Sequence, residues 1–157
     1  MTVETKNPAK ADEPAIPVEA GEQMPEEVGH FPGDPFFELG LAPIIVDDIA
    51  AQGLTEPTPI QHEAIPAILA GHDLIGLAQT GTGKTAAYLL PLLNKLLDKR
   101  KANEVRRTNV LILAPTRELA YQISDSIKAF SGSFKVRYIT ICGGERYDFQ
   151  IRSLNKG

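Results

Sequence analysis

Short apolar runs alternate with longer amphipathic stretches from Phe36 to the end of the chain. Three of the short runs, at residues 73–78, 109–114 and 136–141, have the length and composition of strands. Each of them precedes a segment with helical character. This order predicts an α/β domain in which β-α units feed a parallel sheet.

Two helices are predicted before the first strand. Residues 43–52 and 59–70 each begin with a proline, whose fixed φ suits the first position of a helix, and each is followed by a glycine that ends it. Two longer helices follow, at residues 84–99 and 116–130. Pro91 should bend the first of these, because it removes one ladder donor. Thr116 is placed as the N-cap of the second.

Residues 1–35 differ from the rest of the chain in composition. They hold eight Asp and Glu residues against two lysines, a net charge of −6, whereas the remainder has a net charge of +2. They also contain six of the twelve prolines and have no apolar periodicity. Such a segment cannot bury enough surface to offset its ordering entropy, so residues 1–35 are predicted to be a disordered acidic extension. Residues 36–157 form the predicted domain.

The bulk composition places the chain among cytoplasmic globular proteins. Hydrophobic residues make up 43% of the chain, enough to build a core. A single cysteine excludes an internal disulfide, and the chain has neither a cleavable signal nor a run of about eighteen apolar residues. No membrane association is expected.

The stretch LIGLAQTGTGKTAAYLL at residues 74–90 nearly matches the phosphate-binding pattern G-x-x-x-x-G-K-[ST]. It lies between a predicted strand and a predicted helix, as that loop requires. Gly81 and Gly83 free the backbone, so that successive N–H groups can point at phosphate oxygens. Lys84 would reach the β- and γ-phosphates, and the Thr85 hydroxyl would bind Mg²⁺. The predicted nucleotide-binding residues are Ala78, Gln79, Thr80, Gly81, Thr82, Gly83, Lys84 and Thr85.

Ala78 stands where the pattern has its first glycine. As the last residue of a strand it needs no positive φ, so its methyl group is tolerable there. The alternative, an ordinary strand-turn-helix corner with a surface lysine, does not account for the intact T-G-T-G-K-T in this context.

Gln61 has two interpretations. Pro57 and Pro59 stiffen the turn before it, and a glutamine amide can bond both N6 and N7 of adenine, which would select ATP over GTP. Alternatively, Thr58 and Gln61 form a capping box, in which the Gln61 side chain only satisfies the Thr58 backbone N–H. The neighbouring phosphate loop favours the adenine role.

The segments GLTEPTPIQ (53–61), AQTGTGKT (78–85) and PTRELA (115–120) together resemble the Q motif, motif I and motif Ia of the DEAD-box RNA helicases. The resemblance covers residues 36–157 and implies the N-terminal part of a RecA-like ATP-binding domain. Alanine at position 78 is typical of that family. The resemblance also implies that Phe36, seventeen residues before Gly53, stacks on adenine, although an ordinary core aromatic remains an alternative.

The resemblance further implies contacts with RNA. The matching positions are Pro115, Thr116, Arg117, Gly143 and Gly144. Free N–H groups at a helix start and two glycines after a strand suit a phosphate backbone that is read without regard to sequence. An N-cap and a tight turn are the structural alternatives. Protein partners are not indicated.

The later parts of that family's pattern do not occur between residues 1 and 157. The chain has no D-E-A-D tetrad, so by itself it is expected to bind ATP and Mg²⁺ without hydrolysing ATP. Three strands with an unpaired edge also predict partial order and aggregation. Two other classes fit less well. Another P-loop NTPase has no reason to place Phe36 and Gln61 upstream of the loop, and a non-catalytic binding fragment is the remaining class.

Overall fold

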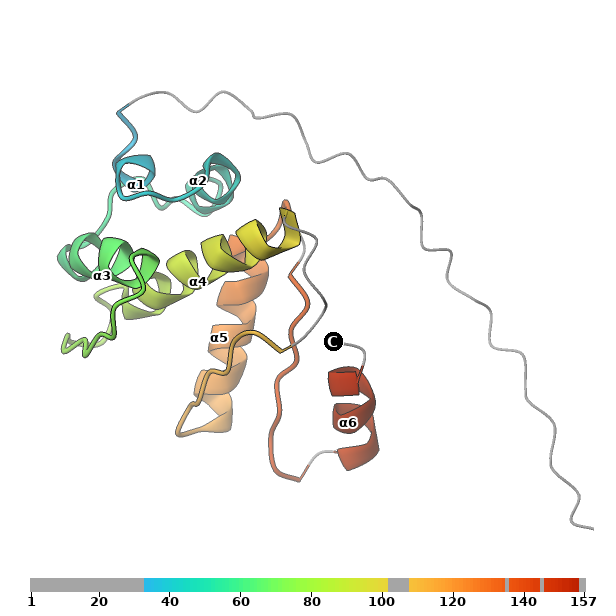
Figure 1. Cartoon of the computed structure of the whole chain (residues 1–157). Helices are drawn as coiled ribbons and strands as arrows, with labels where there is room; N and C mark the ends of the chain where they lie inside the picture. The colour runs from blue at the N-terminus through green and yellow to red at the C-terminus, as the bar shows by residue number, and fades with distance from the viewer. Residues whose placement is uncertain (1–32, 102–107, 135, 145, 156–157) are drawn as a thin grey trace, which may run out of the picture.

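The computed structural model describes residues 33–101, 108–134, 136–144 and 146–155, and of Arg100 and Lys101 only the backbone. The predicted acidic extension at residues 1–35 therefore lies almost wholly outside the described residues. Within them, no helix has the length and apolar character to cross a membrane. Figure 1 shows the arrangement of the described elements.

The described residues contain six helices (Figure 1): α1 (Pro35–Glu38), α2 (Pro43–Ala50), α3 (Pro59–Leu69), α4 (Lys84–Lys101), α5 (Arg117–Phe130) and α6 (Tyr147–Asn155). The four bounded helix predictions are confirmed to within two residues at each end. The helix expected after residues 136–141 is α6, whereas α1 was not expected. Asp34 opens α1, because its carboxylate accepts from the Phe36 and Phe37 N–H groups at 2.8 and 3.1 Å.

The other helix ends follow from local chemistry. Prolines stand at the start of α2 and α3, and the turns after these helices contain Gly53 and Gly71 with φ of 79° and 88°. Thr116 is confirmed as the N-cap of α5, since its hydroxyl accepts from the Leu119 N–H at 3.2 Å. Pro91 lies inside α4 without ending it.

Helices α1, α2, α3, α4 and α5 pack around one apolar cluster, while α6 stands apart from them (Figure 1). The buried members of the cluster are Phe36, Leu39, Leu41, Ile45, Val46, Ile49, Ile65, Ala86, Leu90, Leu93, Leu97 and Phe134. Two groups of hydrogen bonds stabilise this packing. Asn94 accepts from the Ala42 N–H at 2.7 Å, and the Asp48 carboxylate accepts from the Ser133 N–H and hydroxyl.

The predicted parallel sheet is not found in the described part of the chain. Residues 73–78, 109–114 and 136–141 belong to no strand or helix there, so the strand predictions are wrong for these residues. A strand needs a neighbour about 4.8 Å away to pair its backbone groups. Two of the segments instead contact different helices. Gly76 lies near Ile60 of α3, and the Thr140 hydroxyl bonds that of Ser124 of α5 at 2.8 Å.

The unpaired segments expose their apolar side chains. Ile75 and Leu77 are 89% and 90% exposed, and Leu111 and Leu113 are 79% and 84% exposed. These are the positions that a sheet face would cover. The apolar side chains that predicted strands are therefore present, but they are not buried.

Candidate functional site

The loop before α4 contains two glycines in the left-handed region. The φ angles of Gly81 and Gly83 are 83° and 84°, which a residue with a side chain rarely adopts. A Cβ on Gly81 would meet nothing within 4 Å, whereas a Cβ on Gly83 would lie 2.4 Å from Gln61 Nε2. Gly81 is thus required by its conformation alone, and Gly83 by both its conformation and its neighbour.

The N–H groups of this loop are available to an anion. Among the described residues, no hydrogen bond is formed by the backbone N–H groups from Gly81 to Thr85, and the first turn of α4 adds its own free donors. Several inward-facing amides at a helix N-terminus form a favourable site for phosphate oxygens. The residues present therefore fit the phosphate groups of a nucleotide.

The Lys84 ammonium folds back over the loop that precedes it. Its Nζ donates to the carbonyl oxygens of Ala78 and Gln79, the latter at 2.6 Å. The Thr82 hydroxyl donates to the same Gln79 carbonyl at 2.8 Å. Two of the three ammonium N–H groups are thus used within the loop, and the third remains for a phosphate oxygen.

Gln61 links the start of α3 to this loop. Its Oε1 accepts from the Thr58 N–H at 2.9 Å, and its Nε2 donates to the Gly83 carbonyl at 3.1 Å. The Thr58 hydroxyl donates to the Thr82 carbonyl at 2.9 Å. The hydrogen bond that a capping box requires between the Thr58 N–H and the Gln61 side chain is therefore present. The Gln61 side chain also forms a second hydrogen bond, to the loop before α4. The Gln61 side chain is 1% exposed, so the adenine role stays a prediction.

Phe36 is 0% exposed and belongs to the apolar cluster. The structure therefore shows Phe36 as a core aromatic, which is the alternative that the sequence left open. Stacking on adenine would require the ring to become accessible, and it also stays a prediction.

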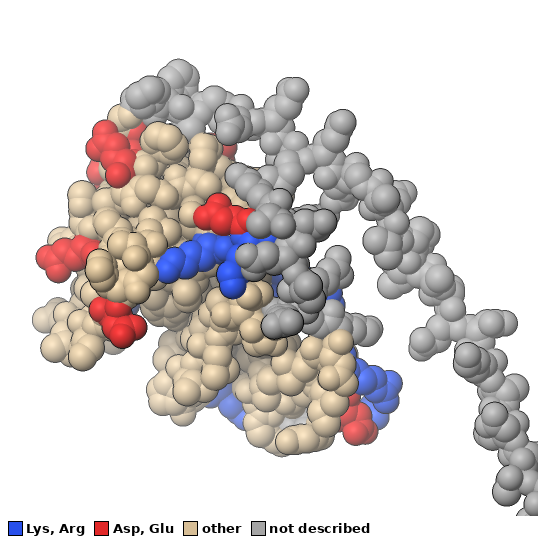
Figure 2. All heavy atoms as spheres, viewed as in Figure 1, with Lys and Arg blue, Asp and Glu red and all other residues tan. Residues whose placement is uncertain are grey.

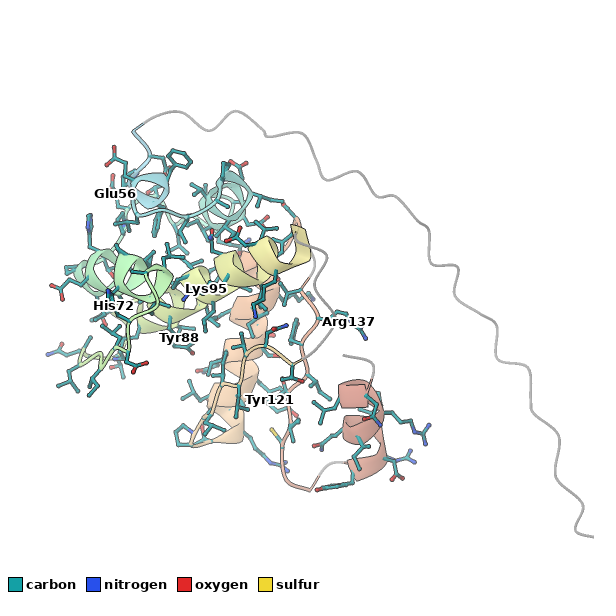
Figure 3. All side chains as sticks on the ribbon, in the orientation of Figure 1. Glu56, His72, Tyr88, Lys95, Tyr121 and Arg137 are labelled. Carbon is teal, nitrogen blue, oxygen red and sulfur yellow. The ribbon has the colours of Figure 1, made fainter. Side chains whose placement is uncertain are left out.

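Thr85, in the first turn of α4, has a neighbour that the sequence analysis missed. Its side chain forms a hydrogen bond with that of Tyr88, three residues later on the same helix. Burial raises the pKa of the Tyr88 phenol above its ordinary value of 10.0, and the bond to Thr85 acts in the opposite direction. Figure 3 labels Tyr88 on α4. The i, i+3 spacing was the available sequence signal.

Within the described residues there is no cluster of three or more His, Cys, Asp or Glu side chains that could hold a metal ion.

The residues predicted to contact RNA meet at one end of α5. Pro115, Thr116 and Arg117 are exposed at its start, and Gly143 and Gly144 are exposed in a turn. A Cβ on Gly144, whose φ is 81°, would lie 2.9 Å from Arg117 Nη2. The Arg117 guanidinium therefore lies directly against the Gly144 backbone. RNA contact by these residues stays a prediction.

Comparison with known proteins identifies the family. The DEAD/DEAH box helicase family matches residues 58–157, and the chain belongs to it. Over 123 residues, or 78% of this chain, it is 45% identical to the ATP-dependent RNA helicase DeaD of Klebsiella pneumoniae, of which it covers 18%. It is 43% identical over the same length to the DeaD helicase of Buchnera aphidicola, of which it covers 20%. The chain thus spans about a fifth of the length of these curated relatives.

A solved structure extends the comparison to the fold. The RNA-helicase Prp28 from Chaetomium thermophilum bound to ADP is similar to this chain with a TM-score of 0.63 and 43% identity. The match covers 73% of this chain and 28% of that one. The matched part of this chain therefore has a fold similar to that of a helicase structure.

Proposed function

We propose that this chain is the nucleotide-binding part of an ATP-dependent RNA helicase, which couples ATP hydrolysis to the unwinding or remodelling of RNA duplexes. The observation that carries the proposal is the loop at Gly81 and Gly83, whose free N–H groups precede α4 and Lys84. Membership of the helicase family and the names of the relatives support it. We further propose that residues 36–157 are the N-terminal part of a RecA-like domain.

The loop residues divide the work of holding a triphosphate. The N–H groups of residues 81–85 bind the β- and γ-phosphate oxygens, and the Lys84 ammonium, which also donates to the Ala78 and Gln79 carbonyls, offsets their charge. The Thr85 hydroxyl would hold Mg²⁺, which would supply positive charge to offset that of the phosphates. Tyr88 fixes the orientation of that hydroxyl through its hydrogen bond.

The remaining predicted residues recognise adenine and RNA. Gln61 bonds the adenine edge and Phe36 stacks on the ring, provided that both side chains become accessible on binding. Pro115, Thr116, Arg117, Gly143 and Gly144 contact the RNA backbone, with the Arg117 guanidinium and the Gly144 turn forming one joint contact. Such contacts bind RNA of any sequence.

The test is nucleotide binding and RNA-stimulated ATP hydrolysis by the full-length protein. Titration with a fluorescent ATP analogue is expected to show binding that Lys84→Ala weakens at least tenfold, because the charge compensation is lost. Lys95→Ala removes a lysine farther along the same helix (Figure 3) and is expected to bind as the wild type does. Equal binding by Lys84→Ala and the wild type would reject the proposal.

A further inference from the structure

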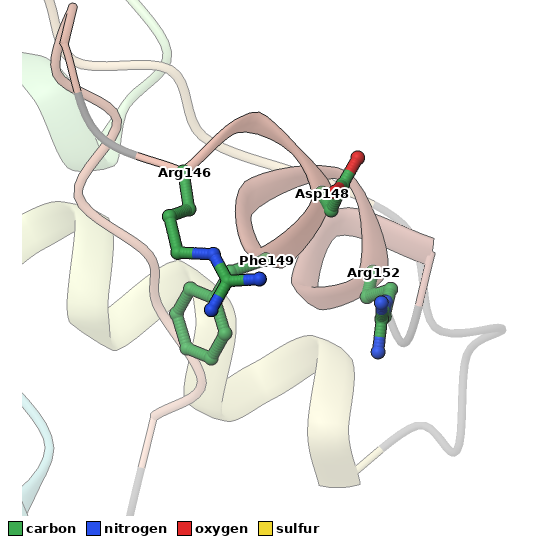
Figure 4. A pocket seen from close by; sticks show the side chains of 4 residues that line it. All are labelled: Arg146, Asp148, Phe149 and Arg152. Carbon is green, nitrogen blue, oxygen red and sulfur yellow. The ribbon is translucent and has the colours of Figure 1, made fainter.

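The start of α6 carries an exposed surface of mixed charge. Arg146, Asp148, Phe149 and Arg152 line a hollow of about 350 Å³, the α6 hollow. All four residues are exposed. Figure 4 shows them around the first turns of the helix, with the Asp148 carboxylate pointing away from Arg146 and Phe149. On the face drawn in Figure 2, basic and acidic side chains also appear together at the lower right, where α6 lies in Figure 1.

The helix that carries this hollow is anchored. Gln150 is buried, and its Nε2 donates to the Cys142 carbonyl at 3.1 Å, which holds α6 to the end of the preceding segment. Phe149 is the neighbour of Gln150 in sequence, yet it is 69% exposed. An exposed ring between two guanidinium groups suits a ligand that has both carboxylates and apolar side chains.

Asp148 indicates that this ligand is a peptide. A carboxylate at the hollow repels a nucleic-acid strand, because every nucleotide of the strand carries a phosphate. A peptide also has backbone N–H groups, from which the Asp148 carboxylate can accept hydrogen bonds. The four lining residues therefore fit an acidic peptide better than a polyphosphate.

We propose that the α6 hollow binds residues 12–28 of the same chain, which lie outside the described residues. This segment, DEPAIPVEAGEQMPEEV, contains six Asp and Glu residues, no Lys or Arg, and four residues of Ile, Val and Met. Its carboxylates pair with the Arg146 and Arg152 guanidinium groups, and one of its apolar side chains covers the Phe149 ring. While the segment is bound, the two arginines are not available to another anion.

The length of the chain before Gly33 allows this contact. From the middle of the segment to Gly33, about 13 residues can span up to about 45 Å. A compact domain of about 120 residues has a radius of gyration of about 14 Å and hence a width of about 35 Å. A short tether also gives an effective concentration in the millimolar range, so that even a weak complex is substantially occupied.

The test is photo-crosslinking in the full-length protein, with a benzophenone amino acid in place of Phe149 and the adducts mapped by mass spectrometry. Adducts within residues 12–28 are expected. Their yield should fall as the salt concentration rises from about 0.1 to 1 M, because ion pairs at an exposed surface are screened. The matched control has the same amino acid in place of Tyr121, which is 45% exposed on α5 and should give no adduct to this segment.

Charge substitutions test the two sides of the contact separately. Arg146→Gln with Arg152→Gln should lower the adduct yield at position 149 about threefold or more, because the cationic side of each ion pair is lost. Neutralising four glutamates of the segment should have a similar effect. Those substitutions are Glu19→Gln, Glu22→Gln, Glu26→Gln and Glu27→Gln. Lys128→Gln removes a charge from the last turn of α5 and should leave the yield unchanged.

Three results would overturn the proposal. The first is the absence of adducts within residues 12–28, and the second is an equal yield of such adducts from positions 149 and 121. The third comes from repeating the experiment with an added oligouridylate: adducts to RNA, with none to residues 12–28 in its absence, would assign the hollow to RNA. None of these results depends on nucleotide binding, which Lys84→Ala tests separately, so this contact and the proposed function can fail independently.

Discussion

The contact between Gly83 and Gln61 gives the most direct test of the site geometry. Gly83→Ala would place a methyl group 2.4 Å from Gln61 Nε2, closer than non-bonded atoms approach. The amide must therefore move, and we expect it to lose its bond to the Gly83 carbonyl and to withdraw Oε1 from the Thr58 N–H. The substitution thus combines a strained backbone with two lost hydrogen bonds.

The magnitude follows from these two contributions. A left-handed φ costs a residue other than glycine about 1–2 kcal/mol, and each lost hydrogen bond costs about 0.5–1.5 kcal/mol. Gly83→Ala is thus expected to destabilise the loop by about 2–5 kcal/mol. Gly81→Ala is the matched control, because its φ of 83° is nearly the same as the 84° of Gly83 but its Cβ meets nothing within 4 Å. It should cost only the backbone contribution.

Hydrogen exchange of the full-length protein, resolved for the peptides that cover the starts of α3 and α4, measures this difference as a local opening free energy. Gly83→Ala should lower protection in both peptides, and Gly81→Ala in the α4 peptide alone. In a Gln61→Ala background the effects of the two glycine substitutions should become much more similar, since the nearest clash partner is gone and only the Thr58 Oγ1 contact at 3.2 Å remains. Equal effects in the wild-type background would refute the proposed contact.

Three further outcomes follow from the described residues. The contribution of Tyr88 to stability should be constant below its ordinary pKa of 10.0 and should fall as the pH rises above it, because the unfolded phenol ionises first. Denaturation series at pH 9–11 should show a smaller fall for Tyr88→Phe than for the wild type, and equal falls would contradict the burial of Tyr88. Asp48→Ala should destabilise by about 2–3 kcal/mol and Ser133→Ala by about 1 kcal/mol in urea denaturation, because the buried carboxylate accepts from both the Ser133 N–H and its hydroxyl. Equal losses would show that the N–H contacts contribute nothing. The 157-residue chain alone should bind a hydrophobic dye strongly through the exposed segments at residues 73–78 and 109–114. The double variant Leu77→Gln, Leu113→Gln should reduce the fluorescence of the bound dye. Unchanged fluorescence would show that the dye binds elsewhere.

The helices were predictable because their signals are local. Prolines at the first position of α2 and α3, the Thr116 cap and glycines in the turns all act within a few residues. The strands were not, since an extended segment becomes a strand only through a partner elsewhere, and the sequence pattern does not specify that partner. Leu111 and Leu113 show this directly: their apolar character predicted burial, yet they are 79% and 84% exposed.

The candidate site also contains some features that the sequence predicts and others that it does not. The loop residues 78–85 were predicted because the order of glycines, lysine and threonine encodes their chemistry. The 2.8 Å bond between Ser124 and Thr140 and the contact of Arg117 with Gly144 arise from packing, and no spacing rule gives them.

The two roles of Gln61 lead to different nucleotide preferences. If the side chain only caps α3 and holds the Gly83 carbonyl, Gln61→Ala loosens the loop, and affinity for ATP and GTP should fall by the same factor. If it also bonds adenine, ATP affinity should fall further, by about 1–3 kcal/mol or five- to a hundredfold. Gln61→Glu sharpens the comparison, because its carboxylate still accepts from the Thr58 N–H but cannot donate to adenine N7. Its added charge near the phosphates weakens ATP and GTP alike, so the ratio of the two affinities is the measurement. An unchanged ratio in both variants would leave Gln61 as a residue that positions the loop, in agreement with its 1% exposure.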